Sequence, residues 1–442
     1  MQQINIAIVG YGTVGNAVAQ ILEKEKELLA QKSGFLINLQ KVYTRNWDKD
    51  FQFPLKDTQK ASSLDEILNN PSIDIVVELT GGIEFPLYLF RECIKKQKHI
   101  VTANKALLAE KGKEIFQLAE EKNVRIGFEA SVAGGIPVIR ALREGLVANK
   151  IKNIYGILNG TTNFILTKMY AENKNFHEIL KEAQEKGYAE ADPTLDINGT
   201  DAAHKIAILA SLAYGGFLDF SNIYVEGIEN IEKLDIELGK ELGYILKLLA
   251  ISKAHNEQVE IRVHPTFLPQ TNPLSSVNGV FNAILIEGNY VGETMFYGKG
   301  AGGEPTASAV VSDIVDIGKS LVLGVGREIE VTSMNWRHKD LNLKKVEDFY
   351  TRYYIRFTVP DIIGVLSKIA AIFARYKISI AAVIQKEKVV ELYTKNTEKT
   401  VPLVILTHTA SENNIQKAIK DIESQKITKS RTVIIRVEDP EE

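Results

Sequence analysis

The stretch that decides the fold is Ile4-Asn-Ile-Ala-Ile-Val-Gly10-Tyr-Gly12-Thr13-Val14-Gly15. Residues 4–9 are apolar except for Asn5 and rich in β-branched side chains, which predicts a strand, and apolar residues at helical spacing follow Gly15. Glycines between a strand and a helix allow a tight turn and a close approach of the backbone to a pyrophosphate. This context predicts dinucleotide binding by Gly10, Gly12, Thr13, Val14 and Gly15, and the alternative is an ordinary glycine turn.

The alternation of strand and helix continues through the first 150 residues. Short apolar runs at 35–42, 73–78, 99–102 and 124–128 predict further strands, with helical patterns between the last three. Strands that alternate with helices are typical of parallel βαβ units. We therefore expect an α/β fold in which residues 1–150 form a Rossmann-type, doubly wound parallel sheet that binds NAD(P).

The pattern changes at about Lys150. Strand-like stretches follow at 151–158, 259–267, 280–287 and 290–296, and helical patterns at 176–186 and 200–213. They predict an α+β domain with antiparallel strands at residues 151–334. A last helical pattern, at about 306–323, could fold back onto the first domain or onto the layer of the second.

Residues 335–349 are polar, charged and without apolar periodicity, so we interpret them as a linker. Beyond them, residues 350–442 show the order strand, helix, strand, strand, helix, strand, which predicts a ferredoxin-like βαββαβ domain. Such a unit supplies its own two-layer core. We therefore expect it to pack separately, so that a chain ending near Glu330 keeps its activity.

The composition favours a folded protein in a reducing compartment. The 442 residues are 45% hydrophobic and 25% charged, with a formal net charge of -3. This charge gives no basic field to hold nucleic acid or an anionic membrane. A single cysteine, Cys93, cannot form an intrachain disulfide, and no signal peptide is apparent, so we expect a cytoplasmic protein.

Two lysines are candidates for acid-base chemistry. Thr200 is a plausible helix N-cap, and Asp201 and Lys205 at i,i+4 spacing lie on one helix face. A protonated lysine beside an acid can donate a proton to a carbonyl oxygen, and the alternative is a surface ion pair. Lys105 follows a parallel-type strand, at the sheet edge where such folds bind ligands, and the alternative is a solvated amine at a helix start.

The end of the second predicted strand carries Thr44-Arg45-Asn46 where an NAD-selective site places an acid. Arg45 indicates a ribose 2′-phosphate and therefore a preference for NADP(H) over NAD(H). The alternative is a solvated surface arginine.

These residues, taken together, resemble the homoserine dehydrogenase family. The resemblance covers residues 1 to about 330, and its most specific part is the pattern of acids and lysine at 187–205. The matching motifs are Gly10–Gly15, Thr102–Lys105, Glu129–Pro137, Asn159-Gly-Thr-Thr-Asn163, Ala189–Lys205 and Gly298–Gly303. The last ninety residues resemble an ACT domain.

The resemblance implies reversible reduction of L-aspartate 4-semialdehyde to L-homoserine with NAD(P)H. By similarity Lys205 donates the proton, Lys105 is a second lysine near cofactor and substrate, and Asp201 orients Lys205. Residues 151–334 would then be the substrate-binding, catalytic and dimerisation domain. The other residues that the family implies are Glu190 and Asp196 for the substrate ammonium, Thr80 and Gly303 for the cofactor, and Glu129, Val132, Gly134 and Ile136 for sodium or another monovalent cation.

The ACT-like domain implies an amino-acid effector, with threonine as the family expectation. Asp361 and Gly364 would lie in its ligand loop, but Ile362-Ile363 replace the basic residue and proline that many ACT domains carry there. A homodimer or homotetramer is expected. The rival functions are an aspartate-semialdehyde-dehydrogenase-like enzyme, which would need Cys93 as its nucleophile, and a non-catalytic dinucleotide and amino-acid sensor.

Overall fold

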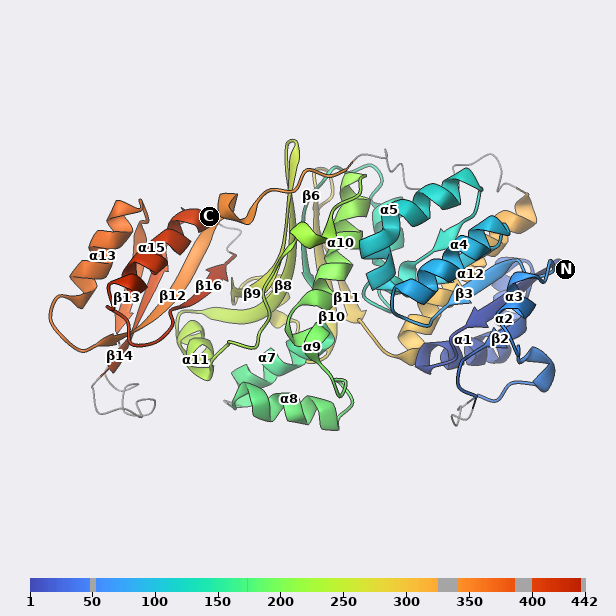
Figure 1. Cartoon of the computed structure of the whole chain (residues 1–442), viewed down its shortest axis with the longest axis horizontal. Coiled ribbons are helices and arrows are strands. Elements are labelled where there is room, and N and C mark those ends of the chain that lie inside the picture. The colour runs from blue at the N-terminus through green and yellow to red at the C-terminus, as the bar shows by residue number, and fades with distance from the viewer. Residues whose placement is uncertain (48–52, 173, 325–339, 386–399, 439–442) are drawn as a thin grey trace.

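The computed structural model describes residues 1–47, 53–172, 174–324, 340–385 and 400–438. These residues form three parts in a row, with the N-terminal sheet at one end and the C-terminal unit at the other (Figure 1). A second, larger sheet runs through the middle and C-terminal parts.

The first sheet is parallel throughout and has the strand order β2-β1-β3-β4-β5. Its strands are β1 (Gln3–Val9), β2 (Leu36–Tyr43), β3 (Ile75–Glu78), β4 (His99–Thr102) and β5 (Ile126–Gly127). The predicted strands and the doubly wound fold are confirmed. The helical pattern after the glycine turn forms two helices instead of one: the first ends at Lys24 and the second begins at Lys26.

Helices cover this sheet. They are α1 (Thr13–Lys24), α2 (Lys26–Ser33), α3 (Asp65–Leu68), α4 (Glu84–Lys95), α5 (Lys105–Glu121) and α12 (Gly303–Leu323). The side chains of α12 share one buried cluster with those of β1 and α1, which includes Ile8, Val18, Val310 and Ile314. The helix at 303–323 therefore packs back on the first sheet.

The middle part is an antiparallel sheet in the order β11-β10-β6-β8-β9. Its strands are β6 (Ile151–Ile157), β8 (Tyr244–His255), β9 (Gln258–Pro269), β10 (Phe281–Gly288) and β11 (Gly292–Lys299), with β7 (Tyr224–Val225) beside β9. Its helices are α6 (Val138–Arg140), α7 (Gly160–Glu172), α8 (Phe176–Glu185), α9 (Thr194–Ile197), α10 (Thr200–Tyr214) and α11 (Lys233–Glu241). The strand β8 and the helices α7 and α11 were not predicted.

The C-terminal part has the predicted βαββαβ order and the strand order β16-β12-β14-β13. Its elements are β12 (Tyr350–Pro360), α13 (Val365–Arg375), β13 (Ile380–Gln385), β14 (Thr400–Thr407), β15 (Ala410–Ser411), α15 (Glu412–Ser424) and β16 (Val433–Val437). Its core is a cluster between the sheet and the two helices, with Tyr353, Phe357, Ile369 and Phe373 among its buried residues.

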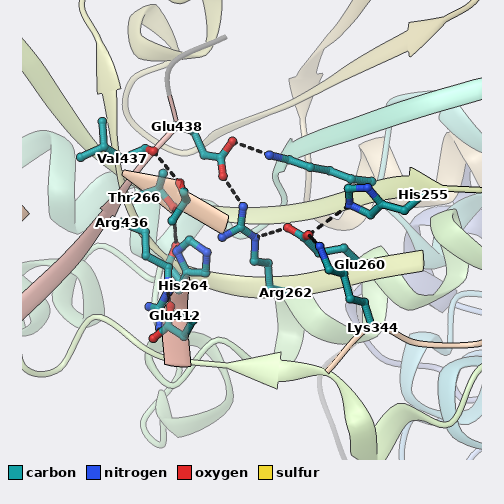
Figure 2. A network of polar contacts seen from close by, with 12 residues as sticks. His255, Glu260, Arg262, His264, Thr266, Lys344, Glu412, Arg436, Val437 and Glu438 are labelled. Atoms are coloured by element: carbon teal, nitrogen blue, oxygen red, sulfur yellow. Dashed lines mark hydrogen bonds and ion pairs between the residues drawn. The ribbon is translucent and has the colours of Figure 1, made fainter. Parts of the chain in front are cut away.

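The expectation that this domain packs separately is wrong. Strand β16 pairs in parallel with β9, so the two sheets are continuous (Figure 1). Buried ion pairs cross the junction, including Arg262 of β9 with Glu438 and Arg356 of β12 with Asp235 of α11 (Figure 2 shows the first). The polarity of residues 335–349 predicted a linker, but a local sequence pattern cannot show whether distant strands pair.

The predicted linker divides into two parts. Residues 335–339 lie outside the described residues. Residues 340–349 run along the middle part, where Leu341 donates to the carbonyl of Phe217 and Lys344 to that of Val259. Among the described residues, no helix is both long enough and apolar enough to cross a membrane.

Candidate active site

The three charged residues predicted for acid-base chemistry meet in one cluster. Asp201 Oδ2 lies 2.7 Å from Lys205 Nζ, and Asp201 Oδ1 lies 2.5 Å from Lys105 Nζ. Lys205 also donates to the carbonyl oxygen of Leu158 over 2.6 Å. Asp201 and Lys205 are buried, whereas the side chain of Lys105 is 40% exposed. Lys105 can therefore meet a ligand from solvent while Asp201 holds both ammonium groups.

The positions of the lysines follow from how their helices begin. Asn104 caps α5, and its Oδ1 accepts the N–H of Leu107 over 3.1 Å, so that Lys105 is the first helical residue. Gly199 precedes α10 with φ 88°, a left-handed conformation that favours glycine. The α10 N-cap is therefore Gly199, and not Thr200 as the sequence suggested.

The three charged groups have separated pKa values. Burial would raise the pKa of Asp201, but the ammonium groups of Lys205 and Lys105 outweigh it and hold that pKa well below its usual range. Burial lowers the pKa of Lys205 despite the opposing effect of Asp201. Burial also acts to lower the pKa of Lys105, but Asp201, with smaller contributions from Asp196 and Glu190, raises it overall. Lys205 is thus the more acidic of the two lysines, as a proton donor requires.

Two polar residues of this site were quoted in a motif but given no role from the sequence. Asn159 Nδ2 donates to both Asp196 Oδ1 at 2.8 Å and Asp201 Oδ2 at 2.9 Å. Thr161 Oγ1 lies 3.1 Å from Asp196 Oδ2 and 2.7 Å from the carbonyl oxygen of Tyr188. The available signal was a polar Asn-Gly-Thr-Thr-Asn run between a strand and an apolar helix.

Asp196 and Glu190 both lie near enough to Lys105 to raise the pKa of its ammonium group. Asp196 is half-buried and is held by Asn159 and Thr161, whereas Glu190 is exposed. The structure therefore brings Asp196 into the hydrogen-bonded group and leaves the Glu190 carboxylate open to solvent and ligand.

The glycine turn after β1 fits a dinucleotide. Gly10 has φ 104°, and a Cβ there would lie 2.6 Å from the backbone of Leu79, while a Cβ on Gly15 would overlap the Gly10 carbonyl. Space around Gly12 is open, and no side chain caps the N-terminus of α1 at Thr13. The free N–H groups and the positive end of the helix dipole suit a phosphate at this point.

Further cofactor candidates gather around this turn. A Cβ on Gly303, the first residue of α12, would lie 3.1 Å from Thr13 Cγ2, so two helix N-termini meet here. Thr80 N and Oγ1 each donate to Glu78 Oε1 over 2.7 Å, which fixes the loop after β3 beside Gly10. Val14 lies in the first turn of α1, between Thr13 and Gly15.

Arg45 follows β2, two residues beyond Tyr43, whose carbonyl accepts the N–H of Gly10. Its guanidinium lies 4.8 Å from the ring centre of Phe85 and is otherwise exposed. This places Arg45 at the edge of the glycine turn with its donors available.

The region suggested for a cation is ordered by Glu129. Its two carboxylate oxygens accept the N–H groups of Ile139 and Arg140, each over 2.9 Å. Burial raises the pKa of Glu129, and burial together with Glu129 raises the pKa of Asp313 to about 7. Val132, Gly134 and Ile136 lie on the following bend, where Ala133 and Gly134 take φ values of 54° and 50°.

Family models match nearly the whole chain. The model described as homoserine dehydrogenase, NAD binding domain, matches residues 10–129, the one described as homoserine dehydrogenase matches 137–315, and the ACT domain matches 353–425. The homoserine dehydrogenase of Helicobacter pylori is 44% identical over 99% of each chain, and that of Bacillus subtilis is 38% identical over 99% of each. The chain belongs to the homoserine dehydrogenase family. It is an oxidoreductase with an NAD-binding domain and a C-terminal ACT domain.

Solved homoserine dehydrogenases have the same architecture. That from Thiobacillus denitrificans is 40% identical, covers 99% of each chain and superposes with a TM-score of 0.93. A hyperthermophilic archaeal homoserine dehydrogenase mutant, solved in complex with NADPH, is 30% identical with a TM-score of 0.61, over 73% of this chain and 98% of that one. The overall fold predicted from the sequence is confirmed.

The ACT domain has a hollow of about 280 Å³ at the loop between β12 and α13, which Asp361 and Gly364 help to line. The side chains of Ile362 and Ile363, in the same loop, are exposed. Cys93, by contrast, is fully buried in α4, and burial raises the pKa of its thiol to about 12. Such a thiol is a poor nucleophile, which disfavours the thioester route of an aldehyde-oxidising enzyme.

Proposed function

We propose that the protein catalyses the reversible reduction of L-aspartate 4-semialdehyde to L-homoserine with NADPH, in the aspartate-derived pathway to threonine, methionine and isoleucine. The observation that carries this proposal is the Lys105–Asp201–Lys205 cluster, in which one lysine starts the helix after β4 of the dinucleotide-binding sheet. Ligands bind at this edge of open α/β sheets.

NADPH, when bound, would supply the hydride for the aldehyde carbon, and the residues of this chain supply the proton. Lys205 donates its proton to the aldehyde oxygen, so that the carbonyl becomes a hydroxyl and Lys205 becomes neutral. Asp201 fixes the ammonium of Lys205 in position, because it accepts a hydrogen bond from it over 2.7 Å. Lys105 adds a second positive charge where the oxygen becomes negative.

Glu190 and Asp196 select the substrate by its ammonium group. The exposed carboxylate of Glu190 and the half-buried carboxylate of Asp196 place negative charge near Lys105, and Asp196 acts on Lys205 as well. An ammonium ion satisfies such a pair, whereas an uncharged aldehyde leaves it without a cation.

The cofactor is NADP(H) in preference to NAD(H). Arg45 supports this preference because its exposed guanidinium stands beside the glycine turn, where a 2′-phosphate would meet it. The cofactor-binding set is Gly10, Gly12, Thr13, Val14, Gly15, Arg45, Thr80, Lys105 and Gly303.

A sodium or similar monovalent cation binds at Glu129, Val132, Gly134 and Ile136. Support comes from the chemistry of the donors, since a carboxylate and the backbone carbonyls of a bend suit a hard ion. The cation would offset the repulsion between the buried carboxylates of Glu129 and Asp313.

The enzyme is a cytoplasmic homodimer or homotetramer regulated by threonine at Asp361 and Gly364 of the ACT domain. Support for self-association is the edge strand β11 and its surroundings, where Tyr290, Met295 and Tyr297 are 82%, 41% and 53% exposed. Exposed apolar residues on a sheet edge favour association with another chain. The lone cysteine supports a reducing compartment.

The test is oxidation of NADPH by the purified protein with L-aspartate 4-semialdehyde, followed by identification of the product. Stoichiometric L-homoserine supports the proposal, and the absence of aldehyde-dependent oxidation supports the sensor. Cys93→Ser separates the remaining rival, because it should leave turnover nearly intact. Loss of turnover in a folded Cys93→Ser variant would favour a thioester mechanism.

A further inference from the structure

Arg436, in the last strand of the ACT domain, reaches across the domain junction. It is only 2% exposed and donates to both oxygens of Glu412, at 2.9 and 2.8 Å, within its own domain (Figure 2). The same guanidinium donates to Glu226 Oε2 over 2.8 Å and to the hydroxyl of Tyr224 over 2.9 Å. Both of these partners belong to the catalytic domain.

Tyr224 and Glu226 form a small rigid unit around β7. The hydroxyl of Tyr224 donates to Glu226 Oε2 over 2.9 Å, and the guanidinium of Arg436 lies 4.7 Å from the centre of the Tyr224 ring. The backbone of this segment is held by β9, since Glu226 N donates to the carbonyl of Val263 over 2.8 Å. Arg436 and β9 therefore hold this segment together, Arg436 through its side chains and β9 through its backbone.

This segment lies directly against the turn between Asp196 and Asp201. The N–H of Ile228 donates to the carbonyl of Ile197 over 2.8 Å. A Cβ on Gly227 would overlap the Ile197 carbonyl and lie 2.6 Å from Asn198 Cα, so the two backbones are in contact. On the other side, Gly199 lies against Val225 and the carbonyl of Glu226.

The turn at 197–199 separates Asp196 from Asp201. A displacement of this turn would therefore move Asp196 relative to the substrate ammonium and Asp201 relative to both lysines. We propose that Arg436 of the ACT domain is a positioning residue for the reaction, which acts through Tyr224 and Glu226 on the turn between Asp196 and Asp201. This inference rests on the proposed function of that site.

A second crossing of the same junction provides a matched control. Arg356 of β12 pairs with Asp235 at 2.6 Å and with the exposed Glu232 at 2.8 Å, both at the start of α11. Each arginine thus holds one buried carboxylate and one more exposed glutamate. Arg436 holds the buried Glu412 of its own domain and the more exposed Glu226, and Arg356 holds the buried Asp235 and the exposed Glu232. The bonds of Arg356 end on Glu232 and Asp235, at the start of α11, whereas the contacts with the 197–199 turn come from residues 225–228.

The experiment compares Glu226→Gln with Glu232→Gln in the full-length enzyme. Each change removes one charge from an arginine that keeps another carboxylate, so we expect both variants to fold with melting temperatures near wild type. Glu226→Gln should lower kcat about tenfold and raise KM for homoserine, because small misplacements of reacting groups are costly. Its alkaline pH limb should also shift, since the contact with Asp201 opposes the effect of burial on the pKa of Lys205, whereas the Kd for NADPH should not change.

Two further variants test the same path. Tyr224→Phe removes only a hydroxyl and should reproduce a weaker form of the Glu226→Gln effect, and Glu226→Asp should restore part of the lost turnover. Equal kinetics for Glu226→Gln and Glu232→Gln, or a changed melting temperature with an unchanged KM and pH profile, would overturn the proposal. Wild-type enzyme in the same assay distinguishes a failure of the proposed function from a failure of this proposal. Inactive wild-type enzyme would contradict the proposed function, whereas active wild-type enzyme with equal variants would contradict the role of Arg436.

Discussion

Lys205 Nζ lies 2.7 Å from Asp201 Oδ2, and both groups are buried on one face of α10. The carboxylate raises the pKa of this lysine while burial lowers it more, so the lysine is more acidic than a free amine and still has a partner for its charge. This balance sets the pH range in which Lys205 can donate a proton.

The balance predicts the pH dependence of Asp201→Asn. Reduction requires protonated Lys205, so its rate falls as pH rises through the lowered pKa of that lysine. Removal of the carboxylate lowers this pKa further, and the alkaline limb for reduction should move to lower pH. Oxidation of homoserine requires neutral Lys205, so its rate should rise through the same pH range. Steady-state pH profiles in both directions check this, and an unmoved limb would contradict the pairing.

Glu190→Gln should raise KM for the substrate at least about tenfold with a smaller change in kcat, because a charged partner for the ammonium is lost. Asp192→Asn is the matched control, since Asp192 is an exposed acid of the same loop that bonds to Thr194. If both variants have wild-type KM values, Glu190 does not bind the substrate.

Arg45→Ala should lower the preference for NADPH over NADH, measured as the ratio of the two kcat/KM values. The loss should fall on NADPH alone, because only that cofactor carries the 2′-phosphate. Arg91→Ala removes an exposed arginine of α4 that pairs with Glu114, and it should leave the ratio unchanged. An equal loss with both cofactors would exclude a phosphate contact.

Threonine should bind to the ACT domain and inhibit turnover in a manner that depends on Asp361. Titration calorimetry and inhibition assays should show weaker threonine binding in Asp361→Asn and no change in Asp348→Asn, an exposed acid before β12. Inhibition that competes with homoserine and persists in Asp361→Asn would place threonine at the active site. No response to threonine would make the domain an element of assembly, as Ile362-Ile363 suggest.

Local patterns were sufficient for much of the fold. The β1 strand and the glycine turn follow from residues 4–15 alone, and Asp201 with Lys205 follows from i,i+4 spacing. The strand β8 was missed because Tyr244–His255 is a nearly continuous apolar run without alternation. The pairing of β16 with β9 was missed because it joins strands far apart in the chain, and no local pattern records such pairing.

The site was predicted in part for the same reason. Lys105 and Asp201 are far apart in sequence, and spacing could not show that one carboxylate holds both lysines. Asn159 was overlooked because its role is to bridge two acids that come together only in the folded chain.

The most direct measurement of the central claim is turnover of L-aspartate 4-semialdehyde by Lys205→Ala, beside NADPH binding by the same variant. If Lys205 donates the proton, kcat should fall by roughly 10² to 10⁴ fold while the Kd for NADPH stays near that of wild type. Near-normal turnover in Lys205→Ala would contradict the account, as would a comparable loss of turnover and NADPH binding.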